Sequence, residues 1–158
     1  MSGGGAPAIQ VDGAGAKVVI VASRWHTEVM DGLIAGARRA LSDANVTDVR
    51  LVRAPGSFEL PIITQAYATA GADAVIALGV IIRGGTPHFE YVSAAATDGL
   101  SRVALDTGVP IGFGLLTTDD EAQALDRAGL VDSHEDKGRE AVEAALATWD
   151  ILRSLPER

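Results

Sequence analysis

Residues 74–82 form an almost unbroken run of aliphatic, largely β-branched side chains, and this run constrains the fold more than any other stretch. A strand that is apolar at successive rather than alternate positions is buried on both faces, as strands inside parallel sheets are. Residues 17–23 are typical of another buried strand, Val49, Leu51 and Val52 of a short strand, and residues 111–117 of a fourth strand. The four runs therefore predict a parallel sheet.

The segments between these runs show helical signals. Apolar side chains recur at helical spacing from residue 30 to residue 41, and Pro61 suits the first turn of a helix that Gly71 ends. Further helices are expected from about Glu90 to residue 106, from a Thr118/Glu121 capping box to Gly129, and from about residue 133 toward residue 155.

Alternation of strand and helix predicts an α/β three-layer sandwich: a doubly wound four-stranded parallel sheet of flavodoxin-like topology with right-handed crossovers. We expect a single domain over residues 17–158. A flexible, extended, glycine-rich N-terminal arm over residues 1–16 precedes it, in which Ile9 and Val11 could form a short pairing segment.

Composition narrows the classes of function. The chain has 158 residues, 47% of them apolar and 4% aromatic, which suits one domain with an aliphatic core. The absence of cysteine excludes disulfides and cysteine-ligated metal sites. A net charge of −8 argues against nucleic acid and anionic membranes as partners. No targeting peptide or stretch of ~20 apolar residues is present, so we expect a cytoplasmic protein without a membrane partner.

Polar and glycine residues follow the 74–82 strand, where ligands bind in open α/β sheets. Gly84 and Gly85 permit a turn whose N–H groups can face an anion, and Thr86 adds a hydroxyl. His88, after Pro87, is a candidate for proton transfer. The stretch predicts an anion site beside a proton-transfer group, although a turn of this kind also simply connects a strand to a helix.

The other strand ends should gather at the same edge. Trp25 offers a flat ring for stacking on a heteroaromatic ligand, or packs as a partly buried residue. Glu59, near Ser57, either contacts a ligand or only satisfies a helix dipole, and Arg127 could be a solvated helix-end cation. Histidine and glutamate pairs at residues 26/28 and 88/90 lack helical i, i+4 spacing and a third ligand, so we expect no metal.

Several segments together resemble the lumazine synthase family, the penultimate enzymes of riboflavin biosynthesis. The similarity runs in order from about residue 17 to residue 150. Trp25 stands where many relatives have Phe, and Gly85 where some have Gln or Ala. The matching segments are 23–26 (Ser-Arg-Trp-His), 55–61 (Pro-Gly-Ser-Phe-Glu-Leu-Pro), 79–82 (Gly-Val-Ile-Ile), 83–89 (Arg-Gly-Gly-Thr-Pro-His-Phe), 114–118 (Gly-Leu-Leu-Thr-Thr) and 123–129 (Gln-Ala-Leu-Asp-Arg-Ala-Gly).

The resemblance implies a transferase that condenses 5-amino-6-ribitylaminopyrimidinedione with 3,4-dihydroxy-2-butanone 4-phosphate, without a cofactor. His88 would transfer protons, and phosphate would contact Gly84, Gly85, Thr86 and Arg127. The residues implied to contact the pyrimidine and its ribityl chain are Trp25, Ser57, Phe58, Glu59, Val80, Ile81, Ile82, Phe113 and Lys137.

The resemblance also implies a homo-oligomer, a ring of five subunits with active sites between neighbours, and riboflavin synthase as a functional partner. Assembly of such rings into a decamer or a sixty-subunit shell is an open alternative. One chain would supply the residues from Trp25 to His88, and its neighbour Phe113, Arg127 and Lys137. Two other readings stay open: a non-catalytic flavodoxin-like protein that binds a flavin or lumazine, and a purely structural shell protein. A carrier of an uncharged lumazine needs neither the proton transfer of His88 nor the phosphate contact of Arg127. A structural shell explains the sheet but not the polar residues at the strand ends.

Overall fold

A computed structural model describes residue 5 and residues 9–157. Strands and helices alternate as the sequence predicts. The elements in chain order are β1 (Lys17–Ser23), α1 (Thr27–Asp43), β2 (Asp48–Ala54), the short 3-10 helix η2 (Ser57–Glu59), α2 (Leu60–Thr69), β3 (Ala74–Ile82), α3 (His88–Thr107), β4 (Ile111–Thr118), α4 (Glu121–Asp126) and α5 (Lys137–Arg153).

The sheet has four strands in the order β2-β1-β3-β4, and every neighbouring pair is parallel. Strand β3 lies in the interior of the sheet, where Val75 pairs with both Val19 and Ile111. Its residues from Ala74 to Val80 are all buried, as the continuous apolar run predicts. The predicted fold class is confirmed.

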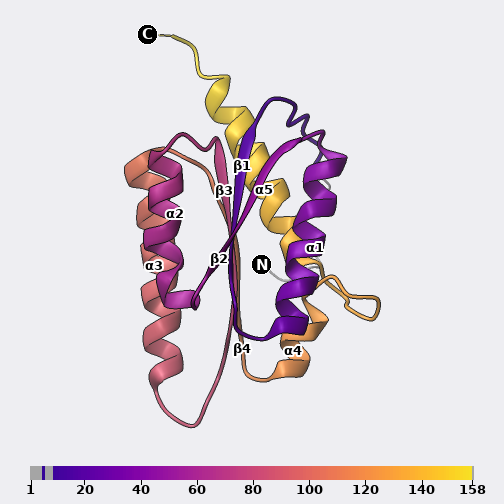
Figure 1. Ribbon diagram of the computed structural model, residues 1–158, viewed down its shortest axis with the longest axis vertical. Coiled ribbons are helices and arrows are strands. Elements are labelled where there is room, and N and C mark those ends of the chain that lie inside the picture. The colour runs from indigo at the N-terminus through magenta and orange to yellow at the C-terminus, as the bar shows by residue number, and fades with distance from the viewer. Residues whose placement is uncertain (1–4, 6–8, 158) are drawn as a thin grey trace.

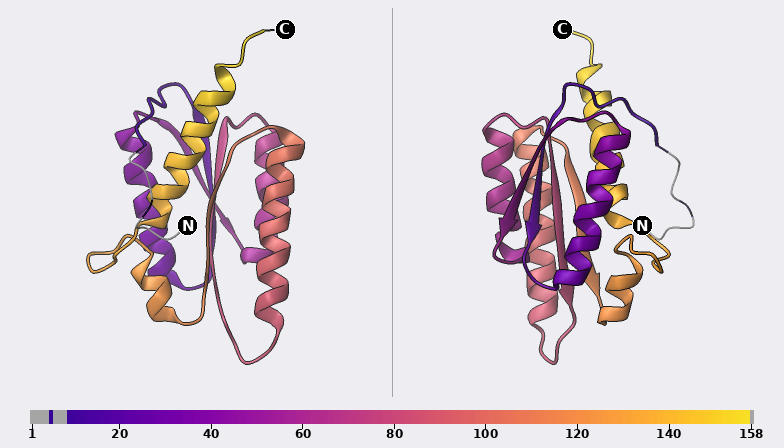
Figure 2. Two further views of the ribbon diagram at one scale, coloured as in Figure 1. Left: turned by 180° about the vertical axis from the view of Figure 1, so that it is seen from behind. Right: turned by 45° about the vertical axis from the view of Figure 1, so that its right-hand side comes forward.

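Helices cover both faces of the sheet and make the three layers (Figure 1). Helices α2 and α3 lie on one face, while α1, α4 and α5 lie on the other, and the view from behind shows the same division (Figure 2). Alternate β1 residues point to opposite layers: Ile20 joins the core beneath α1 and α5, and Val21 joins the core beneath α2 and α3. Both cores are aliphatic, as the composition indicates.

Helix α1 and helix α5 approach each other closely through glycines. A Cβ added at Gly138 would overlap the carbonyl oxygen of Leu33, and one added at Gly36 would overlap the Asp136 carboxylate. Only glycine lets the two backbones come this near. The start of α5 is therefore fixed against α1.

The helix boundaries near the C-terminal half differ from the sequence-based prediction. The expected Thr118/Glu121 capping box is wrong: Thr118 ends β4, and the Asp120 carboxylate accepts the Gln123 N–H at 2.8 Å as the N-cap of α4. The last helix begins at Lys137, four residues later than predicted, with Asp136 as its N-cap. An aspartate is the N-cap of both helices, because its charged carboxylate is a strong acceptor for a backbone N–H.

The predicted arm falls partly on residues 1–4 and 6–8, which lie outside the described residues. Its described part, residues 9–16, forms no strand, and the Gly13 N–H donates to the Ala44 carbonyl at 2.7 Å. Val11 packs partly buried against the core. Among the described residues, no helix combines the length and the apolar character needed to cross a membrane.

Candidate active site

A cavity of about 890 Å³ lies at the carboxyl ends of the strands, beside the first turns of α3. These strand ends are at the bottom of the molecule in Figure 1. The cavity gathers most of the predicted site residues and several that were not assigned. It is lined by Trp25, His26, Gly56, Ser57, Phe58, Glu59, Val80, Ile81, Ile82, His88, Tyr91, Val92 and Ala95.

Large aromatic side chains at this cavity are exposed. Trp25 is 66% exposed, Phe58 63% and Tyr91 75%, although aromatic residues make up only 4% of the chain. Exposed aromatic side chains that gather at one cavity, rather than lying singly, mark a binding surface. Their flat faces suit a heteroaromatic ring. The second reading of Trp25, as a partly buried packing residue, does not fit its exposure.

The backbone brings the polar residues of the β2–α2 connection close to the strands. A Cβ at Gly79 would stand 2.9 Å from the Ser57 hydroxyl oxygen, and a Cβ at Gly56 would stand 3.3 Å from the Trp25 ring nitrogen. These two glycines let Ser57 lie against β3 and Trp25 lie over the connection. A hydroxyl, a carboxylate from Glu59 and an indole thus line one cavity.

His88 is the first residue of α3, and its helical neighbours complete the cavity wall. Tyr91, Val92 and Ala95 follow it at intervals of three, four and seven residues, which places them on the same helix face. The sequence-based prediction assigned none of these three, although helical spacing from His88 would have found them. His26, also unassigned, has the left-handed φ of 59° that non-glycine residues seldom adopt and that clusters at functional sites.

Arg83 lies at the start of the glycine loop between β3 and α3 and links it to α3 and to the residue after β4. Its guanidinium pairs with Glu90 at 2.5 Å and with Asp119 at 3.0 Å, and it lies 4.4 Å from the centroid of the Phe89 ring. The hydrogen bond from Arg83 lowers the pKa of the Glu90 carboxyl. Gly84, Gly85 and Thr86, which lie in this loop, are exposed to solvent and do not line the cavity.

The remaining predicted residues lie elsewhere. Phe113 is 50% exposed on the edge strand β4, and Arg127 and Lys137 flank the loop between α4 and α5, on the other side of the sheet from α3 (Figure 1). Glu135 contacts both cations, with 3.5 Å to Arg127 Nε and 3.6 Å to Lys137 Nζ. Within one chain, then, the cations are not brought to the cavity that contains His88.

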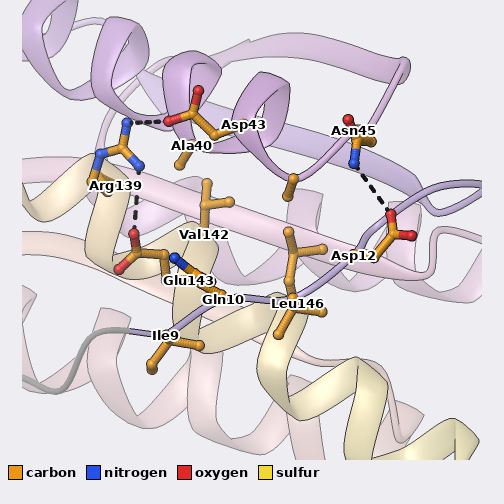
Figure 3. Close-up of a pocket in the computed structure, with 12 residues that line it drawn as sticks. Ile9, Gln10, Asp12, Ala40, Asp43, Asn45, Arg139, Val142, Glu143 and Leu146 are labelled. Carbon is orange, nitrogen blue, oxygen red and sulfur yellow. Dashed lines mark hydrogen bonds and ion pairs between the residues drawn. The ribbon is translucent and has the colours of Figure 1, made fainter.

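A second cavity, of about 610 Å³, lies between residues 9–12 of the arm and helices α1 and α5 (Figure 3). Its cation, Arg139, is paired with Asp43 at 2.9 Å and with Glu143 at 3.5 Å. No predicted site residue lines this cavity. In the part of the chain that the structure describes, no three His, Asp or Glu residues gather in a way that could hold a metal ion.

Comparison with known proteins identifies the family. The family model of 6,7-dimethyl-8-ribityllumazine synthase matches residues 15–153. The chain belongs to the 6,7-dimethyl-8-ribityllumazine synthase family. It is therefore an enzyme, and the resemblance seen in the sequence is confirmed.

Curated relatives of that name match over nearly their full length. The protein from Kineococcus radiotolerans is 64% identical over 155 residues, which cover 98% of this chain and 96% of the relative. The protein from Leifsonia xyli subsp. xyli is 66% identical over 157 residues, covering 98% and 99%. The protein from Streptomyces coelicolor is 56% identical over 158 residues, covering 99% and 98%.

Proposed function

We propose that this lumazine synthase family member condenses 5-amino-6-ribitylaminopyrimidinedione with 3,4-dihydroxy-2-butanone 4-phosphate. The observation that carries the proposal is the cavity that combines the exposed ring of Trp25, the polar groups of Ser57 and Glu59, and His88. A flat ring requires an aromatic face on which it can stack, and its polyol chain requires hydrogen-bonding groups. His88 lines the same cavity, and in this proposal it supplies the imidazole beside the reacting atoms.

The proposed course begins when the ring amine attacks the ketone and forms an imine with loss of water. Phosphate is then eliminated, and the nitrogen that bears the ribityl chain closes the second ring with loss of a further water. Each step moves protons, which imidazole accepts and returns near neutral pH, and such catalysis contributes typically ~10² to 10⁴-fold. Holding both reactants in one cavity supplies much of the remaining acceleration.

The pyrimidine part of the site uses the apolar wall as well as the polar groups. Trp25 and Phe58 provide aromatic faces, while Val80, Ile81 and Ile82 bring the end of β3 to the cavity wall. The glycine loop, held by Arg83, lies next along the chain before His88. In this proposal its backbone and the Thr86 hydroxyl receive the phosphate as it becomes a leaving group.

A second copy of the chain completes the site in this proposal. Among the residues that the structure describes, no Lys or Arg lines the cavity, whereas Arg127 and Lys137 lie on the other side of the sheet. A neighbouring subunit would supply Phe113, Arg127 and Lys137, and because such a contact is heterologous it must close into a ring, proposed here to have five members. The large exposed area of Trp25, Phe58 and Tyr91 supports a covered site in the assembly.

Turnover of the two proposed substrates, followed by the fluorescence of the lumazine product, tests the function directly. His88→Ala should lower kcat by one to three orders of magnitude and leave the Kd of the pyrimidine within a few-fold, because the imidazole acts on protons. Added imidazole should restore part of the lost rate, because it can enter the space that the missing ring leaves in the cavity. Loss of affinity with unchanged kcat would refute the role of His88, and riboflavin binding by wild-type protein without turnover would identify a carrier.

Mixed rings test the division of the site between chains. Glu59→Ala and Arg127→Ala chains, each nearly inactive alone, should regain partial activity when they are refolded together, because some interfaces then join two intact halves. Native mass spectrometry of the mixture checks that rings contain both chains. Mixed rings that remain as inactive as their parents would show that Glu59 and Arg127 do not act across one interface.

A further inference from the structure

Arg127, Glu135 and Lys137 lie on one face of a short two-stranded ladder that leads into α5, whose first residue is Lys137. The Lys137 N–H donates to the Arg127 carbonyl, and the Gly129 N–H donates to the Glu135 carbonyl, both at 3.0 Å. These bonds flank an antiparallel bridge between Ala128 and Asp136. Side chains alternate between the faces of such a ladder, so residues 127, 135 and 137 share a face.

The opposite face of the ladder is fixed against α1. Ala128 is buried, and Asp136 pairs with Arg39 at 3.0 Å. A Cβ at Gly32 would stand 3.1 Å from the Ala128 Cβ, which shows how closely this face packs. The positions of Arg127, Glu135 and Lys137 are therefore set by the backbone and by the packing of α1.

Glu135 places one carboxylate oxygen toward each cation. Oε2 lies 3.5 Å from Arg127 Nε, and Oε1 lies 3.6 Å from Lys137 Nζ. Both separations exceed the ~2.7–2.9 Å of a strong charge-assisted hydrogen bond. Glu140 pairs with Lys137 more closely, at 2.7 Å, but the ion pairs of Glu135 reach both cations. Only 15% of the Glu135 side chain and 17% of the Lys137 side chain are exposed, so solvent screens this group less than a surface pair.

We propose that Glu135 is a positioning and charge-balancing residue of the phosphate site, one that sets how tightly Arg127 and Lys137 hold an anion. The inference rests on the proposed function for its biological meaning. The carboxylate keeps two like charges together before substrate arrives. It also repels the phosphate that lies between them, which limits the affinity for inorganic phosphate and favours its release after elimination.

The test is the affinity of the assembled protein for inorganic phosphate, measured by calorimetry and as a constant for inhibition of turnover. Glu135→Gln should bind phosphate about three- to tenfold more tightly, the change expected when a unit charge near a partly screened anion site is removed. The KM for the pyrimidine should change less than the phosphate affinity does, although the resemblance places Lys137 near that substrate as well. Glu135→Asp, which keeps the charge, should remain closer to wild type than Glu135→Gln does.

Glu143→Gln is the matched control, because Glu143 also lies 3.5 Å from an arginine, Arg139, but at the second cavity (Figure 3). It changes the net charge of the chain equally and should leave phosphate affinity unchanged. Equal tightening in both variants would overturn the proposal, as would unchanged or weaker binding in Glu135→Gln. Calorimetry separates this failure from that of the proposed function: an inactive wild type whose phosphate affinity still responds to Glu135→Gln would refute only the reaction.

Discussion

Replacing Gly138 with alanine should destabilise the fold through the contact between α1 and α5. The added Cβ would overlap the Leu33 carbonyl oxygen and would stand 2.9 Å from the carbon of that carbonyl and 3.1 Å from the Ala37 nitrogen. All three atoms belong to the backbone of α1, so no side-chain rotation relieves the overlap. Helix α5 must move away from α1, or α1 must bend.

The magnitude follows from two opposing effects. Overpacking of a buried site costs about 1–3 kcal/mol, and backbone neighbours place this site at the upper end. Alanine gains at most ~1 kcal/mol over glycine in helix propensity, and less near the helix N-terminus. We expect a net loss of about 2 kcal/mol, which corresponds to a Tm lower by about 4–8 °C for a domain of this size.

Urea denaturation followed by circular dichroism, at one protein concentration, measures this loss. Gly84→Ala is the control, since nothing lies within 4 Å of its added Cβ. Because Gly138 follows Lys137 directly, the variant should also change the affinity for inorganic phosphate. A Gly138→Ala protein as stable as wild type would refute the close approach of α1 and α5.

Three further predictions concern single side chains. Thr64→Val should leave stability unchanged or raise it by up to ~1 kcal/mol in urea denaturation, because the buried Thr64 hydroxyl has no hydrogen-bond partner in the described structure. A loss above 1 kcal/mol would contradict this. Trp25→Phe should abolish most of the fluorescence quenching caused by riboflavin; if the quenching persists, it arises at Trp149, which lies under Arg153. The His134–Asp126 pair should stabilise the fold in a pH-dependent way, since its hydrogen bond raises the pKa of His134 above 6.5 and lowers that of Asp126 below 3.8. The difference in unfolding free energy between wild type and His134→Ala should be largest at pH values between the lowered pKa of Asp126 and the raised pKa of His134. It should fall as the pH rises through the pKa of His134, and a pH-independent difference would exclude the pair.

The sheet could be predicted from sequence because burial on both faces leaves a continuous apolar run. Strand β3 ends at Ile82, where the run ends, and the glycine loop follows at once. The helix termini were less predictable, since Thr118, Asp120 and Ser133 all offer acceptors for a helix N-terminus. At α5 the Ser133 hydroxyl bonds the backbone of Leu125 and Leu130 instead, and the Asp136 carboxylate accepts the Arg139 N–H.

The candidate site was predictable only where strand ends determine it. Trp25, Ser57 and His88 follow different strands and line one cavity, as parallel topology requires. Tyr91 needed the helical spacing from His88 as well. The contact of Glu135 with both cations could not be inferred, because it depends on an irregular loop that folds back on itself between α4 and α5.

The order of the strands explains why the cavity and the cations are apart. Strands β1 and β3 are neighbours, yet β1 continues into α1 on one face and β3 continues into α3 on the other (Figure 1). A crevice opens where adjacent strands diverge in this way, and it receives Trp25 from β1 and His88 from β3. Strand β4 lies at the far edge and continues into α4 on the α1 face, which carries Arg127 away from that crevice. The cavity of one chain is therefore lined by Trp25 but not by Arg127. If both residues act on one pair of substrates, as proposed, Arg127 must come from a second copy of the chain.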